Sequence, residues 1–98
     1  MLNQDQIRNI VCDIGREYQT GPIYLFGSFA KGLETNNSDI DLLMEKGKIR
    51  GLIQLAGVHA AFEKRLGLPV DLLTPDCLDE SFLTQIKPEE ILLYAGTK

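Results

Sequence analysis

The fold and a candidate site are both set by the stretch GSFAKGLETNNSDID, residues 27–41. It follows the apolar run PIYLF and leads into a second apolar run that contains Asp39 and Asp41. Residues two apart in a strand point to the same face, so both carboxylates should converge on one spot while Ile40 and Leu42 face the core. Like charges held this close repel each other, and a divalent cation removes that repulsion. The pair therefore predicts a Mg²⁺ site.

The Gly-Ser pair at the start of this stretch predicts an anion site beside the cation site. Gly27 lets the backbone approach a ligand closely, and Ser28 begins a predicted short helix, residues 28–32, whose free N–H groups attract phosphate. A helix cap alone would also explain Ser28. Lys31 is a further candidate for binding phosphate, although an exposed lysine near a helix end is more often simply solvated.

A third unusual carboxylate lies in the apolar run at residues 70–74, which is the third predicted strand. The alternation along this run separates Asp71 from the apolar residues on either side. If this strand lies beside the second, Asp71 faces Asp39 and Asp41, and the three carboxylates form a cluster that cations make tolerable. The alternative is an edge-strand aspartate that faces water.

These motifs resemble the signature of the polymerase β-like nucleotidyltransferase superfamily, and most closely its small stand-alone branch, the minimal nucleotidyltransferase (MNT) proteins. The resemblance covers nearly the whole chain and rests on GSFAKG (27–32), NSDIDLL (37–43) and LPVDLLT (68–74). Lys31 stands where many relatives carry arginine, which leaves the motif intact.

The resemblance implies a role for each of these residues. Gly27 and Ser28 would hold the triphosphate of a nucleotide, with Lys31 as the further phosphate ligand. The resemblance also implies that the aspartates bind two Mg²⁺ ions, with Asp39 and Asp41 as the pair and Asp71 completing the catalytic site. The implied reaction is transfer of a nucleoside monophosphate, AMP from ATP, to a hydroxyl group.

The resemblance also implies a partner. MNT proteins are paired with a HEPN-domain ribonuclease toxin, and act as antitoxins by transferring AMP to a tyrosine of the toxin, by binding it tightly, or by both. One alternative is a non-catalytic module that neutralises its partner by occlusion. Another is a small-molecule nucleotidyltransferase, which would normally need an additional substrate-binding domain.

Size and composition agree with a small globular enzyme. The 98 residues, 44% hydrophobic and 24% charged, predict a single domain over residues 1–98. A net charge of −4 disfavours broad binding to nucleic-acid backbones. Cys12 and Cys77 lack metal-ligand spacing and are expected to be reduced thiols. With no signal peptide and no long apolar run, we expect a cytoplasmic protein without a membrane span; a homo-oligomer is compatible with the sequence.

Hydrophobic periodicity predicts an α/β (α+β) fold, in which helices flank a small mixed β-sheet. In the helix expected at residues 49–66, the apolar stripes include Leu52 and Ile53 and place His59 as a packed or boundary residue. Glu63 is expected at the solvated end of this helix. The last segment, residues 87–94, is open between helix and strand. The other expected elements are helices at 4–19, 28–32, 49–66 and 79–85, and strands at 22–26, 39–45 and 70–74.

Overall fold

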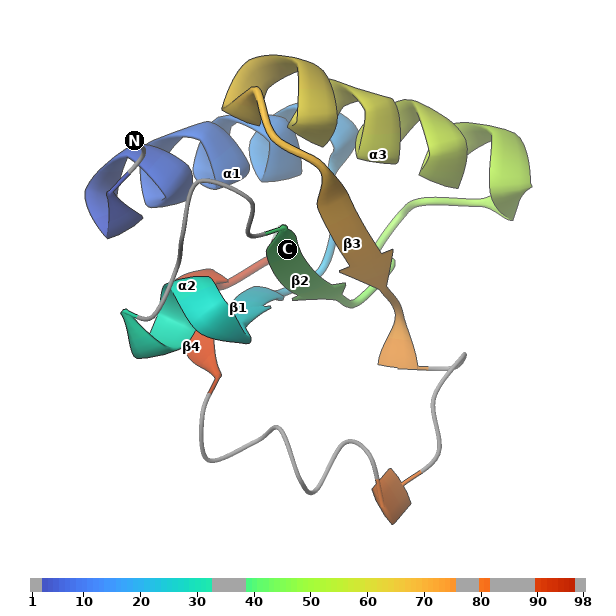
Figure 1. Cartoon of the computed structure of the whole chain (residues 1–98). Helices are drawn as coiled ribbons and strands as arrows, with labels where there is room; N and C mark the ends of the chain where they lie inside the picture. The colour runs from blue at the N-terminus through green and yellow to red at the C-terminus, as the bar shows by residue number, and fades with distance from the viewer. Residues whose placement is uncertain (1–2, 33–38, 76–79, 82–89, 97–98) are drawn as a thin grey trace.

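The two long helices lie side by side on one face of a four-stranded sheet (Figure 1). The computed structural model describes residues 3–32, 39–75, 80–81 and 90–96. The elements in chain order are α1 (Gln4–Tyr18), β1 (Ile23–Phe26), α2 (Ser28–Lys31), β2 (Ile40–Met44), α3 (Gly51–Leu66), β3 (Val70–Leu73) and β4 (Ile91–Tyr94).

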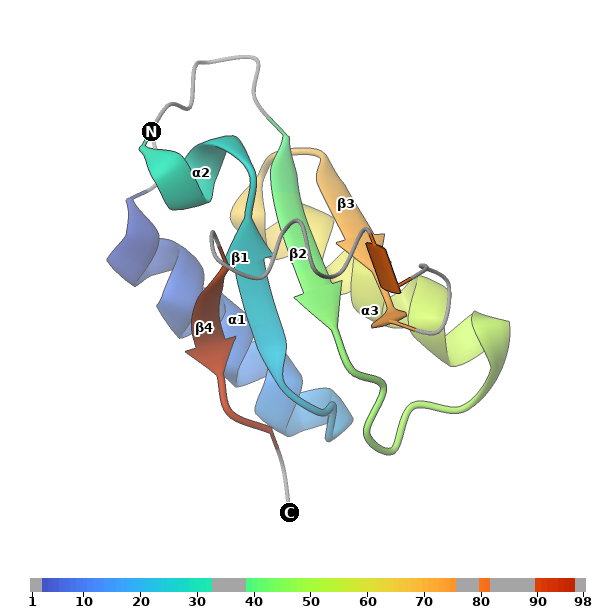
Figure 2. The same ribbon diagram turned by 90° about the horizontal axis from the view of Figure 1, so that it is seen from below.

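The sheet has the strand order β3-β2-β1-β4 and is mixed, as the sequence predicts. β1 runs antiparallel to both β2 and β4, whereas β2 and β3 are parallel (Figure 2). The segment that the sequence left open between helix and strand is therefore a strand, and it extends the sheet beside β1. The helix expected at residues 79–85 lies mostly outside the described residues, of which Glu80 and Ser81 are helical.

Helix α1 is well specified by its sequence. Asn3 and Gln6 form a capping box, in which the Asn3 side chain accepts the backbone N–H of Gln6 at 2.8 Å and the Gln6 side chain accepts that of Asn3 at 3.0 Å. Gly15 lies so close to the ring of Tyr94 that an added β-carbon would be 2.5 Å from its Cδ2 atom. This absence of a side chain lets α1 pack closely against β4.

The hydrophobic core lies between this helical layer and the sheet. Strand residues that point toward the helices are fully buried, among them Ile40 and Leu42. The predicted direction of these two side chains is therefore confirmed. The other members of this core are Ile7, Val11, Ile14, Ile23, Leu25, Phe29, Met44, Ile49, Val58, Phe62, Leu66, Val70, Leu93 and Tyr94.

The first turn of α3 differs from the prediction. Leu52 and Ile53 follow the helical period of the apolar stripe, yet they are 82% and 90% exposed. The reason is the placement of the helix, because its first turn extends past the edge of the sheet in both views (Figures 1 and 2). Core contacts on α3 come instead from Val58, Phe62 and Leu66. No helix among the described residues combines the length and apolar character needed to cross a membrane.

Candidate active site

Two of the three predicted carboxylates lie directly opposite each other in the sheet. Asp41 pairs with Asp71 in the parallel ladder between β2 and β3. Because Ile40 and Leu42 are buried toward α1 and α3, Asp41 points to the opposite face of the sheet, and Asp71 shares that face. The strand arrangement on which the cluster prediction depended is thus present.

The environment of Asp41 opposes its ionisation. The pKa of this half-buried carboxyl is raised from 3.8 to about 6, first by burial, then by a side-chain hydrogen bond with Asp71. The negative charges of Asp71 and Asp39 raise the pKa further. Such crowding of carboxylates is the condition that a bound cation relieves.

Asp39 is exposed and acts on Asp41 through its charge. No three His, Cys, Asp or Glu side chains within the described ranges come close enough together to make a ready metal-binding group. The geometry therefore gives an Asp41–Asp71 pair with Asp39 nearby. The complete three-carboxylate metal site stays a prediction.

The Gly-Ser turn lies against this pair. Gly27 has a positive φ of +74°, and a β-carbon there would overlap Oδ2 of Asp41. The strand register explains the contact, since Phe26 of β1 pairs with Asp41 of β2 and Gly27 follows it immediately. The sequence predicted a close approach of Gly27 to a ligand, which stays a prediction; the structure gives a close approach of Gly27 to the Asp41 carboxyl.

The remaining predicted nucleotide-binding residues lie on α2. Gly27 occupies the cap position of this helix without a side-chain cap bond, and Ser28 is the first helical residue, so Ser28 is not at the cap position that the sequence allowed for it. Ser28 is partly buried, whereas Lys31 is exposed at the end of the helix. Their binding of phosphate stays a prediction.

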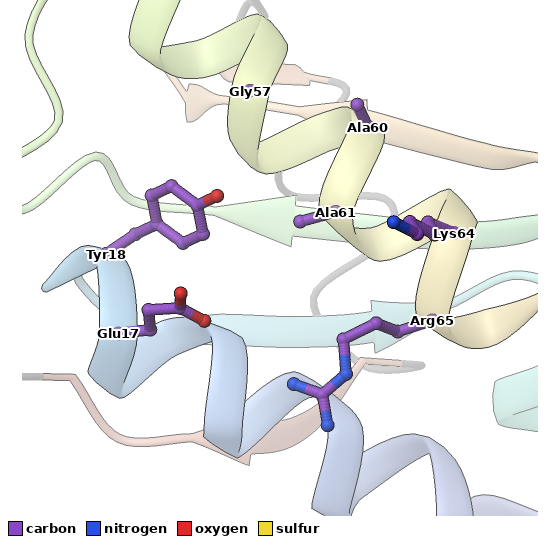
Figure 3. A pocket seen from close by; sticks show the side chains of 7 residues that line it. All are labelled: Glu17, Tyr18, Gly57, Ala60, Ala61, Lys64 and Arg65. Atoms are coloured by element: carbon purple, nitrogen blue, oxygen red, sulfur yellow. The ribbon is translucent and has the colours of Figure 1, made fainter.

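A separate hollow lies between α1 and α3. Figure 3 shows Tyr18 and Glu17 on one side and Lys64 and Arg65 on the other, in a depression of about 490 Å³. The helices cover the face of the sheet opposite to Asp41 and Asp71, so this hollow is not part of the carboxylate site. Its other lining residues are Gly57, Ala60 and Ala61.

Comparison with known proteins assigns the family. The family described as "Polymerase beta, Nucleotidyltransferase" matches residues 11–98. The chain belongs to this nucleotidyltransferase family. The structure of a putative minimal nucleotidyltransferase superposes with a TM-score of 0.79 and 27% identity, covering 92% of this chain and 95% of that one. This nucleotidyltransferase is therefore one of the MNT proteins, as its motifs indicated, and its mixed fold is confirmed.

Curated relatives of this nucleotidyltransferase are protein adenylyltransferases. A putative protein adenylyltransferase of Methanocaldococcus jannaschii is 34% identical over 80 residues, which are 80% of this chain and 79% of the relative. The protein adenylyltransferase MntA of Thermococcus cleftensis is 25% identical over 95 residues, covering 93% of this chain and 96% of the relative. A toxin–antitoxin crystal structure with AMP-PNP matches with a TM-score of 0.77 and 25% identity, over 93% of this chain and 74% of that one.

Two residues that the sequence motifs do not include contact the strand carrying Asp71. His59 was expected to be a packed or boundary residue, and it is half-exposed as expected, but its ring also contacts the backbone of Val70. Glu63, expected at a solvated helix end, accepts a hydrogen bond from the same residue. The only sequence signal for this arrangement is their spacing of four, which places both side chains on one face of a helix.

Proposed function

We propose that this nucleotidyltransferase transfers AMP from ATP to a tyrosine hydroxyl of a HEPN-domain partner protein and thereby acts as an antitoxin. One observation carries the proposal: Gly27 contacts the carboxyl of Asp41, which faces Asp71. A turn suited to phosphate thus adjoins a carboxylate pair suited to a cation, and a nucleoside triphosphate with its metal needs both. A cytoplasmic location, where ATP is supplied, belongs to this proposal.

The comparisons support protein as the acceptor. The relatives in Methanocaldococcus jannaschii and Thermococcus cleftensis carry the name protein adenylyltransferase. The toxin–antitoxin structure with AMP-PNP combines an ATP analogue with a partner protein. The tyrosine and the HEPN domain come from the resemblance of the motifs GSFAKG and NSDIDLL to the MNT signature.

The donor atoms of the site suit a divalent cation. Asp41 combines partial burial with crowding by two other carboxylates, and a hard cation such as Mg²⁺ prefers oxygen ligands of this kind. Asp39, Asp41 and Asp71 would together hold two Mg²⁺ ions. When bound, Mg²⁺ would supply charge neutralisation at the α-phosphate and at the leaving pyrophosphate.

The chain's own residues would orient the reactants and accept a proton. Gly27, Ser28 and Lys31 would bind the triphosphate, with Gly27 allowing it close to the backbone. The acceptor oxygen attacks the α-phosphorus, the bond from that phosphorus to the bridging oxygen breaks, and pyrophosphate leaves. Asp71, the more exposed member of the pair, would accept the hydroxyl proton.

The test is transfer of radioactive label from ATP to the partner protein that co-purifies with the chain. Label in the α-phosphate should appear on the partner in the presence of Mg²⁺, and label in the γ-phosphate should not, because pyrophosphate leaves. The variant with both Asp39→Ala and Asp41→Ala should give no labelled partner. Glu17→Ala, which removes an exposed carboxylate from the helical layer, is the matched control and should label normally.

The outcomes separate this proposal from its alternatives. A stable complex that carries no label, in the wild type and in the double variant alike, would support neutralisation by occlusion and overturn the transfer proposal. Label on a tyrosine, identified by mass spectrometry of the partner, would support the proposed acceptor. Label on a small molecule but not on protein would indicate a small-molecule nucleotidyltransferase.

A further inference from the structure

The outer edge of β3 is held by two side chains of α3. β3 is an edge strand of the described sheet, and Pro69 just before it accepts a hydrogen bond from the Ile40 N–H of β2 at 3.0 Å. In a parallel pair, successive residues point their backbone groups alternately toward and away from the neighbouring strand. The N–H and C=O groups of Val70 therefore point to the open edge.

Both groups find a partner on α3. The Val70 N–H donates to Oε2 of Glu63 at 3.0 Å. Nε2 of His59 lies 2.6 Å from the Val70 carbonyl oxygen, and because a carbonyl only accepts, Nε2 is the donor. His59 Nε2 and Glu63 Oε2 are 3.7 Å apart, so the two side chains and one peptide residue form a compact cluster.

This cluster fixes the peptide group that leads to Asp71. The Val70 carbonyl belongs to the planar peptide unit that joins Val70 to Asp71, so the His59 hydrogen bond fixes the orientation of that plane. The Val70 side chain is buried in the core, which fixes the other side of the strand. Together these contacts determine where the Asp71 carboxyl points and keep it opposite Asp41.

We infer that His59 and Glu63 are positioning residues for Asp71 in the transfer reaction, an inference that rests on the proposed function for its kinetic consequence. Burial does not account for either residue, since their side chains are 42% and 45% exposed. His59 and Glu63 hold the Val70 backbone at the edge of the sheet, and through it they set the direction of the Asp71 side chain.

The experiment compares substitutions that keep or remove each hydrogen bond in the full-length chain. Glu63→Gln keeps an oxygen acceptor, whereas Glu63→Met has a similar shape without one. His59→Gln keeps a nitrogen donor, whereas His59→Leu removes it. The matched control is Cys12→Ala, because Cys12 Sγ on α1 donates to the Leu93 carbonyl at 3.1 Å, an equivalent helix-to-strand bond at the other end of the sheet.

We expect Glu63→Met and His59→Leu to lower kcat for AMP transfer by about tenfold or more, as loss of a supporting contact behind a catalytic group typically does. The KM for ATP should change by less than about twofold, because Gly27 and Asp41 are unaltered. Glu63→Gln and His59→Gln should recover most of the rate. Cys12→Ala should keep the wild-type kcat even where it lowers the melting temperature.

A second measurement does not depend on catalysis. Carbon-13 NMR of the aspartate carboxyl groups should show the Asp71 resonance shifted in Glu63→Met and His59→Leu, and unshifted in Cys12→Ala. An unshifted Asp71 resonance in both variants would overturn the inference even if the wild type proves to transfer no AMP. Equal loss of kcat in Glu63→Gln and Glu63→Met would overturn it as well, because the acceptor atom would then not matter.

Discussion

Asp41 and Asp71 lie directly opposite each other in the parallel pair β2–β3. A hydrogen bond between two carboxyl groups needs a proton on one of them, so the hydrogen bond with Asp71 favours the protonated form of Asp41 and raises its pKa. Burial of Asp41 is the larger reason for its raised pKa, and the bond adds to it. Binding of a cation between these groups would therefore release a proton, and this coupling can be measured.

Asp41→Asn should abolish AMP transfer and preserve the fold. The amide has nearly the same shape as the carboxyl and can still hydrogen-bond to Asp71, but it lacks the charge that a metal ligand provides. We expect the initial rate of transfer to fall at least about 100-fold. In metal-free buffer the variant should melt no lower than the wild type, because the repulsion between carboxylates is gone. Retained transfer would remove Asp41 from the catalytic site.

The stability of the metal-free protein should depend on the ionisation of Asp41. Its pKa in the folded state, about 6, lies above the unfolded value near 3.8, so the folded state binds the proton more tightly. The resulting stabilisation is fully present below the unfolded value and is lost as the pH rises through about 6. Because solvent reaches part of the Asp41 carboxyl and screens its charge, we expect an effect of only about 1 kcal/mol.

This dependence is isolated by comparing the wild type with Asp41→Asn, since the carboxylates that do not interact with Asp41 titrate equally in both. Melting temperatures would be measured in EDTA from about pH 4 to about pH 8. The wild type should lose roughly 4–8 °C relative to the variant over this range. A constant difference across the whole range would show that the Asp41 carboxyl has an ordinary pKa in the folded protein.

Mg²⁺ with AMP-PNP should stabilise the wild type at neutral pH. A ligand that binds only the folded state adds about 2.7 kcal/mol at a concentration about 100 times its dissociation constant. We expect a higher melting temperature with Mg²⁺ and AMP-PNP together than with either alone, because the Gly27 turn and the Asp41 carboxyl are adjacent. An equal rise in Asp41→Asn would place the metal elsewhere.

Much of the fold could be predicted because its elements have strong local signals. The capping residue Asn3 and the periodic apolar residues specify α1 directly. The segment Ile91–Tyr94 has no such signal, because four apolar residues suit a helix or a strand, and only pairing with β1 decides between them. The exposure of Leu52 and Ile53 also could not be predicted from the sequence, since it depends on where α3 begins relative to the edge of the sheet.

The candidate site was predictable in its composition and less so in its arrangement. From the sequence, Asp71 could be grouped with Asp41 only on the condition that their strands are neighbours. The parallel pairing of β2 and β3 fulfils this condition. The contacts of His59 and Glu63 with Val70 could not be foreseen, because they depend on which backbone groups of β3 face the open edge. Periodicity gives the face of a strand but not the identity of its neighbours.

Gly27→Ala should damage both stability and transfer, whereas Gly32→Ala should affect stability alone. Both glycines have a positive φ, +74° at Gly27 and +71° at Gly32, but their ψ angles are −152° and 23°. Gly32 has the left-handed helical conformation, which costs another residue about 1 kcal/mol, whereas the conformation of Gly27 is essentially restricted to glycine and costs more. A β-carbon at Gly32 meets nothing within 4 Å, whereas one at Gly27 overlaps Asp41 Oδ2.

The transfer rates of these variants therefore test displacement of the Asp41 carboxyl, because both variants carry backbone strain and only Gly27→Ala also overlaps Asp41. Melting curves should show a larger loss for Gly27→Ala, by about 1 kcal/mol or more, because its backbone strain is greater and its β-carbon overlaps Asp41. The initial rate of AMP transfer, measured well below both melting temperatures, should fall at least about tenfold for Gly27→Ala and stay near the wild-type value for Gly32→Ala. Equal rates in the two variants would mean that the approach of Gly27 to Asp41 has no part in placing the carboxyl for catalysis.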